Sequence, residues 1–112
     1  MTMNSMHDEE FADVMRALGH PVRLSILRIL AEKQSDCCCT DVTECLPLAQ
    51  STVSQHIKVL LDAGLVVRSS KGTRNCYSLD TERLGALNGA FAGLLTGLSA
   101  DLVPRRPEHE PA

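Results

Sequence analysis

Between positions 48 and 65 the chain reads LAQSTVSQHIKVLLDAGL, a short amphipathic segment that stops at a glycine. Apolar residues recur in it at helical spacing and are expected to bury one side: Val53, Ile57, Leu60 and Leu61. Gly64 provides the left-handed residue that commonly ends a helix. The segment therefore predicts a helix with one buried and one exposed side.

The exposed side of this helix offers hydrogen-bond donors and acceptors and brings no carboxylate that would repel phosphates. Its polar residues are Gln50, Ser51, Thr52, Ser54, Gln55 and His56, followed by Lys58. Side chains of these types can contact base edges in a DNA major groove. An ordinary amphipathic surface helix has the same features, so this segment alone leaves both interpretations open.

The length of the chain indicates one small domain. Its 112 residues suffice for one hydrophobic core and are too few for two. No apolar run approaches the roughly 20 residues that span a bilayer, and the N-terminus does not resemble a signal peptide. We therefore expect a cytoplasmic protein without a membrane partner.

The regions around the amphipathic segment predict further helices. Residues 8–18 and 21–33 are expected to be helical, residues 34–39 to form a loop, and residues 40–46 to form a short third helix, for which Thr40 or Asp41 can cap the start. Pro47 ends that helix, so a tight turn separates it from the next, as in a helix-turn-helix. Residues 8–102 form the expected domain, residues 1–7 a mobile N-terminal arm, and residues 103–112 a disordered tail.

Two β-prone runs follow, at residues 65–69 and 75–79, and they predict a hairpin wing with a basic tip. The formal net charge of −3 argues against indiscriminate binding to nucleic acid. Residues 50–79 nevertheless contain four basic residues and the single acid Asp62, and the local sign of charge matters most at a phosphate-binding face. Lys71 and Arg74 at the tip can reach the sugar-phosphate backbone. A solvated turn without a ligand is the alternative.

Residues 81–102 predict a final helix with an unusual glycine pattern. Gly85, Gly89, Gly93 and Gly97 are spaced by four, and each costs about 1 kcal/mol relative to alanine in a helix interior. A stripe of small residues allows another helix to approach closely, and the surrounding leucines supply apolar area. We therefore expect this helix to pack against the first helix and against its symmetry mate in a dimer.

In this order, the motifs resemble the ArsR/SmtB family of bacterial winged-helix transcriptional repressors over residues 11–98. The resemblance rests on ALGHPVRLSIL (residues 17–27), LAQSTVSQHIKVL (residues 48–60) and AGLV (residues 63–66). It implies a mainly α fold with a two-stranded β wing, the homodimeric winged helix-turn-helix, and an operator DNA partner that is released on induction; it does not imply an enzyme. Two recognition helices would meet successive major grooves. Ala49 departs from the family's usual capping serine, for which Ser51 is a possible substitute.

The expected roles on DNA follow from these placements. Arg23 and the wing cations Lys71 and Arg74 are candidates for phosphate contacts, as are Thr52 and Lys58. For His56, packing against the preceding helix is the alternative to base contact. The candidates for base contact are Gln50, Ser51, Ser54, Gln55 and His56.

The five cysteines, an odd number without an export signal, indicate reduced thiols for metal or redox chemistry more than a disulfide framework. The run DCCCTDV (residues 36–42) falls where the arsenic and heavy-metal sensors that this chain resembles have Cys-x-Cys followed by aspartate; the usual spacing is absent here. Cys37, Cys38 and Cys39 can still form a soft three-thiol site for arsenite, As(III), or antimonite as inducer, provided that they lie in an irregular loop. No organic cofactor is expected.

Other uses of the cysteines remain open at this point. Cys45 is expected to be a buried small hydrophobe, and Cys76 to be structural, incidental or a redox partner. The final helix contains no histidine, so a zinc or nickel site there is not expected. The alternatives are a redox or reactive-sulfur switch, a sensor of another soft metal such as cadmium, and, last, a thiol enzyme or metal carrier, which would lack a nearby histidine base.

Overall fold

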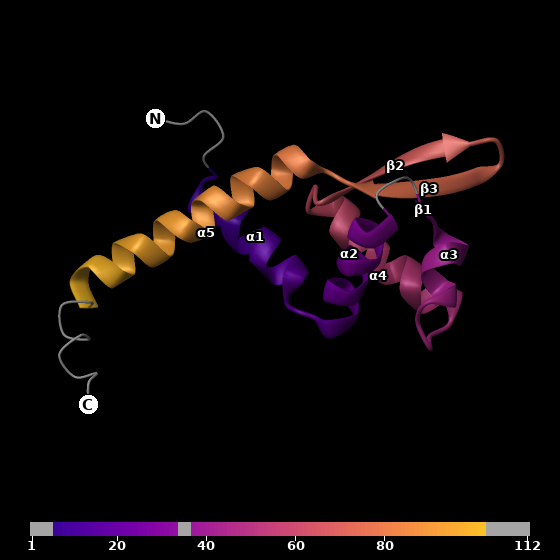
Figure 1. Cartoon of the computed structure of the whole chain (residues 1–112), viewed down its shortest axis with the longest axis horizontal. Coiled ribbons are helices and arrows are strands. Elements are labelled where there is room, and N and C mark those ends of the chain that lie inside the picture. Colours follow the sequence, from indigo (N-terminus) through magenta and orange to yellow (C-terminus); the bar gives the residue numbers. More distant parts are fainter. Residues whose placement is uncertain (1–5, 34–36, 103–112) are drawn as a thin grey trace.

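The computed structural model describes the path of residues 6–33 and 37–102, with side chains for residues 6–33, 42–70, 72–73 and 75–99. This part of the chain forms α1 (Asp8–Leu18), α2 (Pro21–Lys33), β1 (Cys37–Cys38), α3 (Cys39–Glu44), α4 (Gln50–Asp62), β2 (Val66–Lys71), β3 (Arg74–Leu79) and α5 (Thr81–Leu102). Helices α1 to α4 and the strands pack together, and α5 extends away from them beside α1 (Figure 1). None of the described helices is long and apolar enough to cross a bilayer.

The helix bounds agree with the sequence-based expectation except in α3, which begins at Cys39 instead of Thr40 and ends at Glu44 instead of Leu46. Cys37 and Cys38, expected in a loop, form strand β1, and α3 begins at Cys39. Thr40 and Asp41 therefore lie within the helix instead of capping it. The loop prediction was wrong because a two-residue strand is defined by its pairing partner and not by a pattern of its own. The tail at 103–112, residues 34–36 and, apart from Met6 and His7, the arm at 1–7 lie outside the described residues.

The apolar face of α4 occupies the centre of the core. Val53, Ile57 and Leu60 are each at most 2% exposed. Leu61, also expected to be buried, is only partly so, because it lies on the side of α4 that faces the wing. The residues that complete the buried cluster come from the other helices and from the sheet: Val14, Ala17, Ile26, Leu30, Val42, Leu65, Val66 and Tyr77. This packing determines which face of α4 is turned outward.

Helix α4 ends as the sequence predicts, at a left-handed glycine. Gly64 has a φ of +81°. The N–H of Leu65 donates a hydrogen bond to the carbonyl oxygen of Leu60 at 3.0 Å, and the N–H of Gly64 donates to that of Leu61 at 3.0 Å. This pattern is the Schellman ending of a helix, which satisfies carbonyl groups of the last turn.

Arg83 of α5 connects this turn to two other helices. Its Nε donates to the carbonyl oxygen of Ala63 at 3.3 Å, and its guanidinium forms an ion pair with Glu10 of α1. The hydrogen bond and charge of Arg83 lower the pKa of the Glu10 carboxyl group. Asp80 accepts a hydrogen bond from the backbone N–H of Arg83 at 3.0 Å and so holds the first turn of α5.

The wing is the predicted antiparallel hairpin, with an additional short strand beside the middle of β3. The sheet order is β1-β3-β2, so β3 is central. The hairpin register runs from Val66 opposite Leu79 to Lys71 opposite Arg74. The short strand β1 pairs antiparallel with β3. Because α3 starts at the residue after β1, the sheet joins the helix-turn-helix to the wing.

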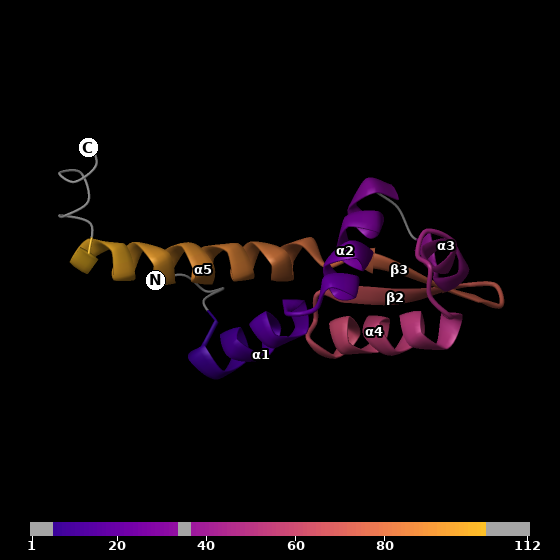
Figure 2. The same cartoon turned by 90° about the horizontal axis from the view of Figure 1, so that it is seen from below.

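Helix α5 packs beside α1, as expected (Figure 2). Much of its apolar surface is nevertheless exposed. Phe91, Leu94, Leu95 and Leu98 are between 41% and 53% exposed. A Cβ atom added at any of the four spaced glycines would meet no described atom within 4 Å. The stripe of small residues is therefore open within the described part of the chain, and α1 does not supply the close helix approach expected there.

We expect Gly64→Ala to lower the free energy of unfolding by about 1–2 kcal/mol, the cost of placing an L-residue in the left-handed conformation. The added Cβ would also come within 3.0 Å of Nε of Arg83. Urea unfolding followed by circular dichroism at one fixed protein concentration measures the change.

Gly72→Ala is the matched control, because Gly72 has a φ of +66° and open space around its Cβ position. It should show the backbone cost alone. Equal decreases for the two variants would mean that the Arg83 contact has no effect, and an unchanged Gly64→Ala protein would contradict the left-handed requirement.

Candidate nucleic-acid interface

Burial of one side of α4 leaves its polar side facing solvent. The exposed polar residues in its first turns are Gln50, Ser51, Ser54, Gln55 and Lys58, and Thr52 is half-buried; Val59 and Asp62 are exposed nearer its end. Residues 45–49 form the turn between α3 and α4, and the two helices pack against each other. Ala49 precedes α4 in an extended conformation and makes no side-chain capping bond. The arrangement is the expected helix-turn-helix, with hydrogen-bonding groups along the outer side of its second helix.

His56 occupies a different position from the other polar residues of α4. Its ring is half-buried and lies against the ring of His20, with the centroids 4.5 Å apart, and Nη1 of Arg23 is 3.3 Å from its Nδ1. Burial, followed by the charges of His20 and Arg23, lowers the pKa of His56. A neutral ring can accept a hydrogen bond from the guanidinium. His56 therefore helps to hold α4 against α2, and its base contact stays a prediction.

Arg23 is also engaged within the protein. Its Nε donates to the carbonyl oxygen of Ala17 at the end of α1, at 2.6 Å. Nδ1 of His20 accepts a hydrogen bond from the backbone N–H of Val22 at 3.1 Å. These bonds satisfy backbone groups between α1 and α2. Arg23 would therefore have to make its predicted phosphate contact while it also bridges the two helices.

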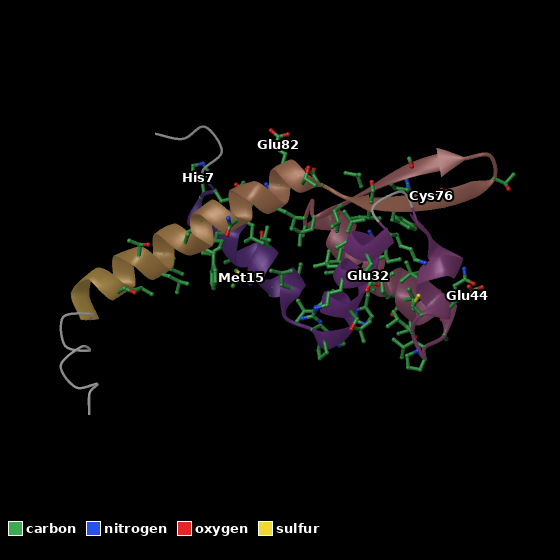
Figure 3. All side chains as sticks on the ribbon, viewed as in Figure 1. His7, Met15, Glu32, Glu44, Cys76 and Glu82 are labelled. Atoms are coloured by element: carbon green, nitrogen blue, oxygen red, sulfur yellow. The ribbon has the colours of Figure 1, made fainter. Side chains whose placement is uncertain are left out.

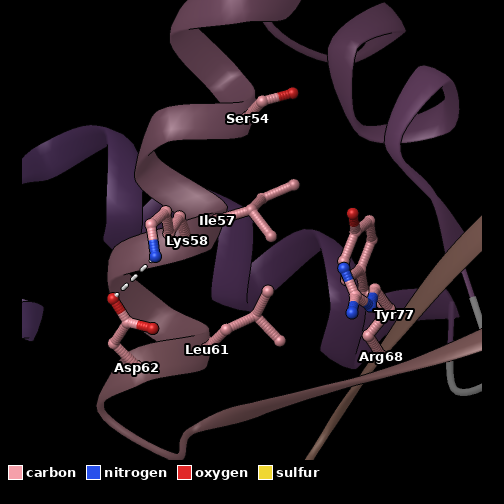
Figure 4. Close-up of a pocket in the computed structure, with 7 residues that line it drawn as sticks. All are labelled: Ser54, Ile57, Lys58, Leu61, Asp62, Arg68 and Tyr77. Carbon is pink, nitrogen blue, oxygen red and sulfur yellow. Dashed lines mark hydrogen bonds and ion pairs between the residues drawn. The ribbon is translucent and has the colours of Figure 1, made fainter.

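An open cleft of about 500 Å³ lies between α4 and the wing (Figure 4). Lys58 on its helix side is paired with Asp62, with 3.3 Å between Nζ and the carboxylate oxygen, and both side chains are about 70% exposed. Such a pair contributes about 0.3–0.5 kcal/mol, so Lys58 can exchange it for a phosphate at little cost. The cleft is lined by Ser54, Ile57, Lys58, Leu61, Asp62, Arg68 and Tyr77.

Arg68 is the functional candidate that sequence reasoning missed. It lies opposite Tyr77 in the β2–β3 register and faces α4 across the cleft (Figure 4). The sequence could have indicated this position. Arg68 and Val66 are two residues apart in β2, so their side chains lie on the same face of the sheet, and the side chain of Val66 is buried. Lys71 and Arg74 occupy the tip of the hairpin, where the sequence placed them. Basic residues thus lie along the wing from the cleft to the tip.

The five cysteines lie in four different parts of the fold: β1, α3, the turn after α3, and β3. Cys37 and Cys38 form β1 and Cys39 starts α3, so the irregular loop required for the predicted three-thiol site is not present. Cys45, expected to be buried, is exposed, because α3 ends at Glu44 and Cys45 falls in the following turn. Cys76 is buried on β3, 3% exposed. Among the residues whose side chains the structure describes, no three His, Cys, Asp or Glu side chains form a metal-binding cluster.

Known proteins share this sequence pattern. Residues 20–67 match the model of a family described as bacterial regulatory protein, arsR family. An uncharacterised HTH-type transcriptional regulator of Methanocaldococcus jannaschii is 40% identical over 76 residues, which cover 68% of this chain and 84% of the relative. The arsenical resistance operon repressor of Bacillus subtilis is 36% identical over 78 residues, which cover 70% of this chain and 73% of the relative.

Solved structures share the fold. An ArsR-like transcriptional regulator from Rhodococcus sp. RHA1 aligns over 94% of this chain and 97% of its own, with a TM-score of 0.75 and 21% identity. A homodimeric winged helix-turn-helix DNA-binding domain from Mycobacterium bovis, described as a possible ArsR-family transcriptional regulator, aligns over 82% of both chains with a TM-score of 0.62 and 23% identity. These structures share the winged helix-turn-helix fold, and the family model and the sequence relatives show that the chain belongs to the arsR family of DNA-binding transcriptional regulators.

Proposed function

We propose that this protein is a cytoplasmic, inducer-responsive transcriptional repressor that binds operator DNA as a homodimer and is released by trivalent arsenic, or antimony, bound to cysteine thiolates. The observation that carries the DNA-binding part is the outward face of α4, which is polar, exposed and next to a basic wing. A helix with these properties can enter the major groove while the wing contacts the backbone. Residues 8–102 form the DNA-binding and dimerisation domain.

The dimer in this proposal forms through α5. Its apolar side chains are about half exposed, and its spaced glycines offer an open stripe to a second helix. Met15 of α1, at 37% exposed, extends the uncovered apolar surface (Figure 3). Burial of this surface against a symmetry mate would favour association by about 25 cal/mol for each Å² removed from water. The twofold axis would present one α4 to each half of a near-palindromic operator.

The roles on DNA follow from exposure and position. Gln50, Ser51, Ser54 and Gln55 contact bases, and His56 does so only if it leaves His20. Thr52 and Lys58 contact phosphates near the helix. Lys71 and Arg74 contact phosphates from the wing, and Arg68 adds a cation at the cleft between the wing and α4.

The inducer in this proposal acts through the thiols at the start of α3. Thiolates prefer soft ions, and Cys37, Cys38 and Cys39 immediately precede or begin the helix that packs on α4. A ligand that changes the path of this segment would displace α4 relative to its groove. The arsenical resistance repressor among the sequence relatives supports this choice of ion. Typical coupling between inducer and DNA is on the order of 1–3 kcal/mol, or about 5–150-fold in affinity.

Gln55→Ala should weaken binding to the operator by about tenfold or more, the discrimination that one bidentate base contact provides, and leave binding to random DNA unchanged. Fluorescence anisotropy with a duplex selected by the protein from a random pool, and with its scrambled counterpart, measures both. Equal weakening on the two duplexes would remove Gln55 from the base contacts.

Removing a positive charge at the wing tip should weaken binding to the operator and to random DNA alike, unlike Gln55→Ala. We expect Lys71→Ala to weaken binding to all duplexes and to reduce the slope of log K against log salt by about 0.9 for each phosphate that the variant no longer neutralises. Lys33→Ala, at the far end of α2 from the α4 face, removes the same charge and is the control (Figure 2). Identical salt slopes for the two variants would contradict a phosphate contact at Lys71.

Arsenite added to the reduced protein on its operator should lower the affinity by about 5–150-fold. Gel-shift or anisotropy titration detects the release. Cys45→Ser, which removes an exposed thiol, should respond as the wild type does, whereas Cys38→Ser should lose the response. Operator binding that persists in excess arsenite, with all thiols reduced, would exclude arsenite as the inducer.

A further inference from the structure

Cys76 of β3 lies opposite Cys38 of β1. The two strands pair antiparallel, with Cys38 as the register partner of Cys76 and Cys37 as that of Tyr77. On the other side of β3, Ser69 of β2 is the register partner of Cys76. Two cysteines that are far apart in the sequence therefore occupy neighbouring positions in one row across the sheet.

The same register separates Cys37 from this row. Consecutive residues of a strand fall on opposite faces of a sheet. Cys37 therefore shares a row with Tyr77 and Arg68, whereas Cys38 shares one with Cys76. Backbone pairing thus groups Cys38 with a thiol on the wing in preference to its immediate neighbour Cys37.

The spacing of facing strand positions suits a bridging ion better than a direct sulfur–sulfur bond. Directly opposed residues in antiparallel strands have Cβ atoms about 4.5–5.5 Å apart. A disulfide draws the two Cβ atoms to about 3.8 Å through a bond of about 2.05 Å. Two sulfurs bound to one ion through bonds of about 2.3 Å, the zinc–thiolate length, span a wider gap.

Burial of Cys76 favours an uncharged product. Cys76 is 3% exposed and lies on the part of β3 that is beside β1 (Figure 3). A charged ion taken into such a position would lose its hydration at a large cost, whereas a neutral arsenic–thiol adduct does not incur that cost. Trivalent arsenic hydroxide reacts with thiols to give such a neutral adduct.

We propose that Cys38 and Cys76 together bind trivalent arsenic, or antimony, across β1 and β3, which makes Cys76 a ligand of the inducer site. This inference rests on the proposed function above and replaces the set of three neighbouring thiols, Cys37, Cys38 and Cys39, by the pair Cys38 and Cys76. Each thiol replaces one hydroxide of As(OH)₃: an As–S bond forms, an As–O bond breaks, and the thiol proton leaves with the hydroxide as water, without a change of oxidation state. The bound arsenic connects β3, the central strand of the sheet, to the residue before α3.

A two-thiol reagent tests the pair directly. In the reduced full-length variant Cys37→Ser/Cys39→Ser/Cys45→Ser, only Cys38 and Cys76 remain. Phenylarsine oxide, whose arsenic can bind two thiols, should form one adduct with loss of water, detected by native mass spectrometry. Adding Cys76→Ser to this variant should abolish the adduct. An adduct that survives this change, or that never forms although circular dichroism shows a folded protein, would overturn the pair.

Arsenite titration of single variants separates this inference from the proposed function. Cys76→Ser should lower arsenite affinity by at least about tenfold. Replacing a residue that only supports a metal ligand already lowers metal affinity by about that factor, and Cys76 is proposed as a ligand itself. Cys45→Ser should bind as the wild type does. If the wild type binds no arsenite, the proposed inducer is wrong; if it binds and Cys76→Ser matches it, only the role of Cys76 is wrong.

Discussion

Burial of Val53, Ile57 and Leu60 in the core is the constraint on which the rest of this structure depends. A helix repeats every 3.6 residues, so fixing one apolar stripe also fixes the direction of the opposite side. Hydrophobic packing on the buried side of α4 therefore determines which residues of the helix face solvent. The Schellman ending at Gly64 then stops the helix and turns the chain into the wing at a defined point.

Two sets of contacts link α4 to the elements around it. Strand β1 pairs with β3 and runs directly into α3, so the backbone joins the sheet to the helix that packs on α4. Arg83 joins the end of α4 to α1 through Ala63 and Glu10, and it belongs to the helix with the uncovered apolar face. The inferred inducer site and dimer interface are thus each one packed element away from α4.

The position of His56 is one that the sequence pattern alone could not decide. It sits between polar Gln55 and buried Ile57, at the boundary of the two sides of α4, and its residue type is compatible with either side. Only the neighbouring helix decides the outcome, because His20 and Arg23 of a segment more than thirty positions earlier supply the ring contact and the nearby guanidinium. Arg68 was missed for a related reason: its importance depends on the cleft that the wing makes with α4.

Helical periodicity, turn residues and contiguous motifs are local properties of the chain, so the sequence was enough to predict the presence of each helix, the glycine that ends α4, the hairpin and the family. The structure was needed to show that residues 37–38 form a strand, that Cys45 is exposed, and that Cys38 is the register partner of Cys76. A two-residue strand has too few side chains to show an alternating pattern, and its register is set by backbone hydrogen bonds to β3. The sequence therefore did not show that a cysteine of the wing pairs in register with one that precedes α3.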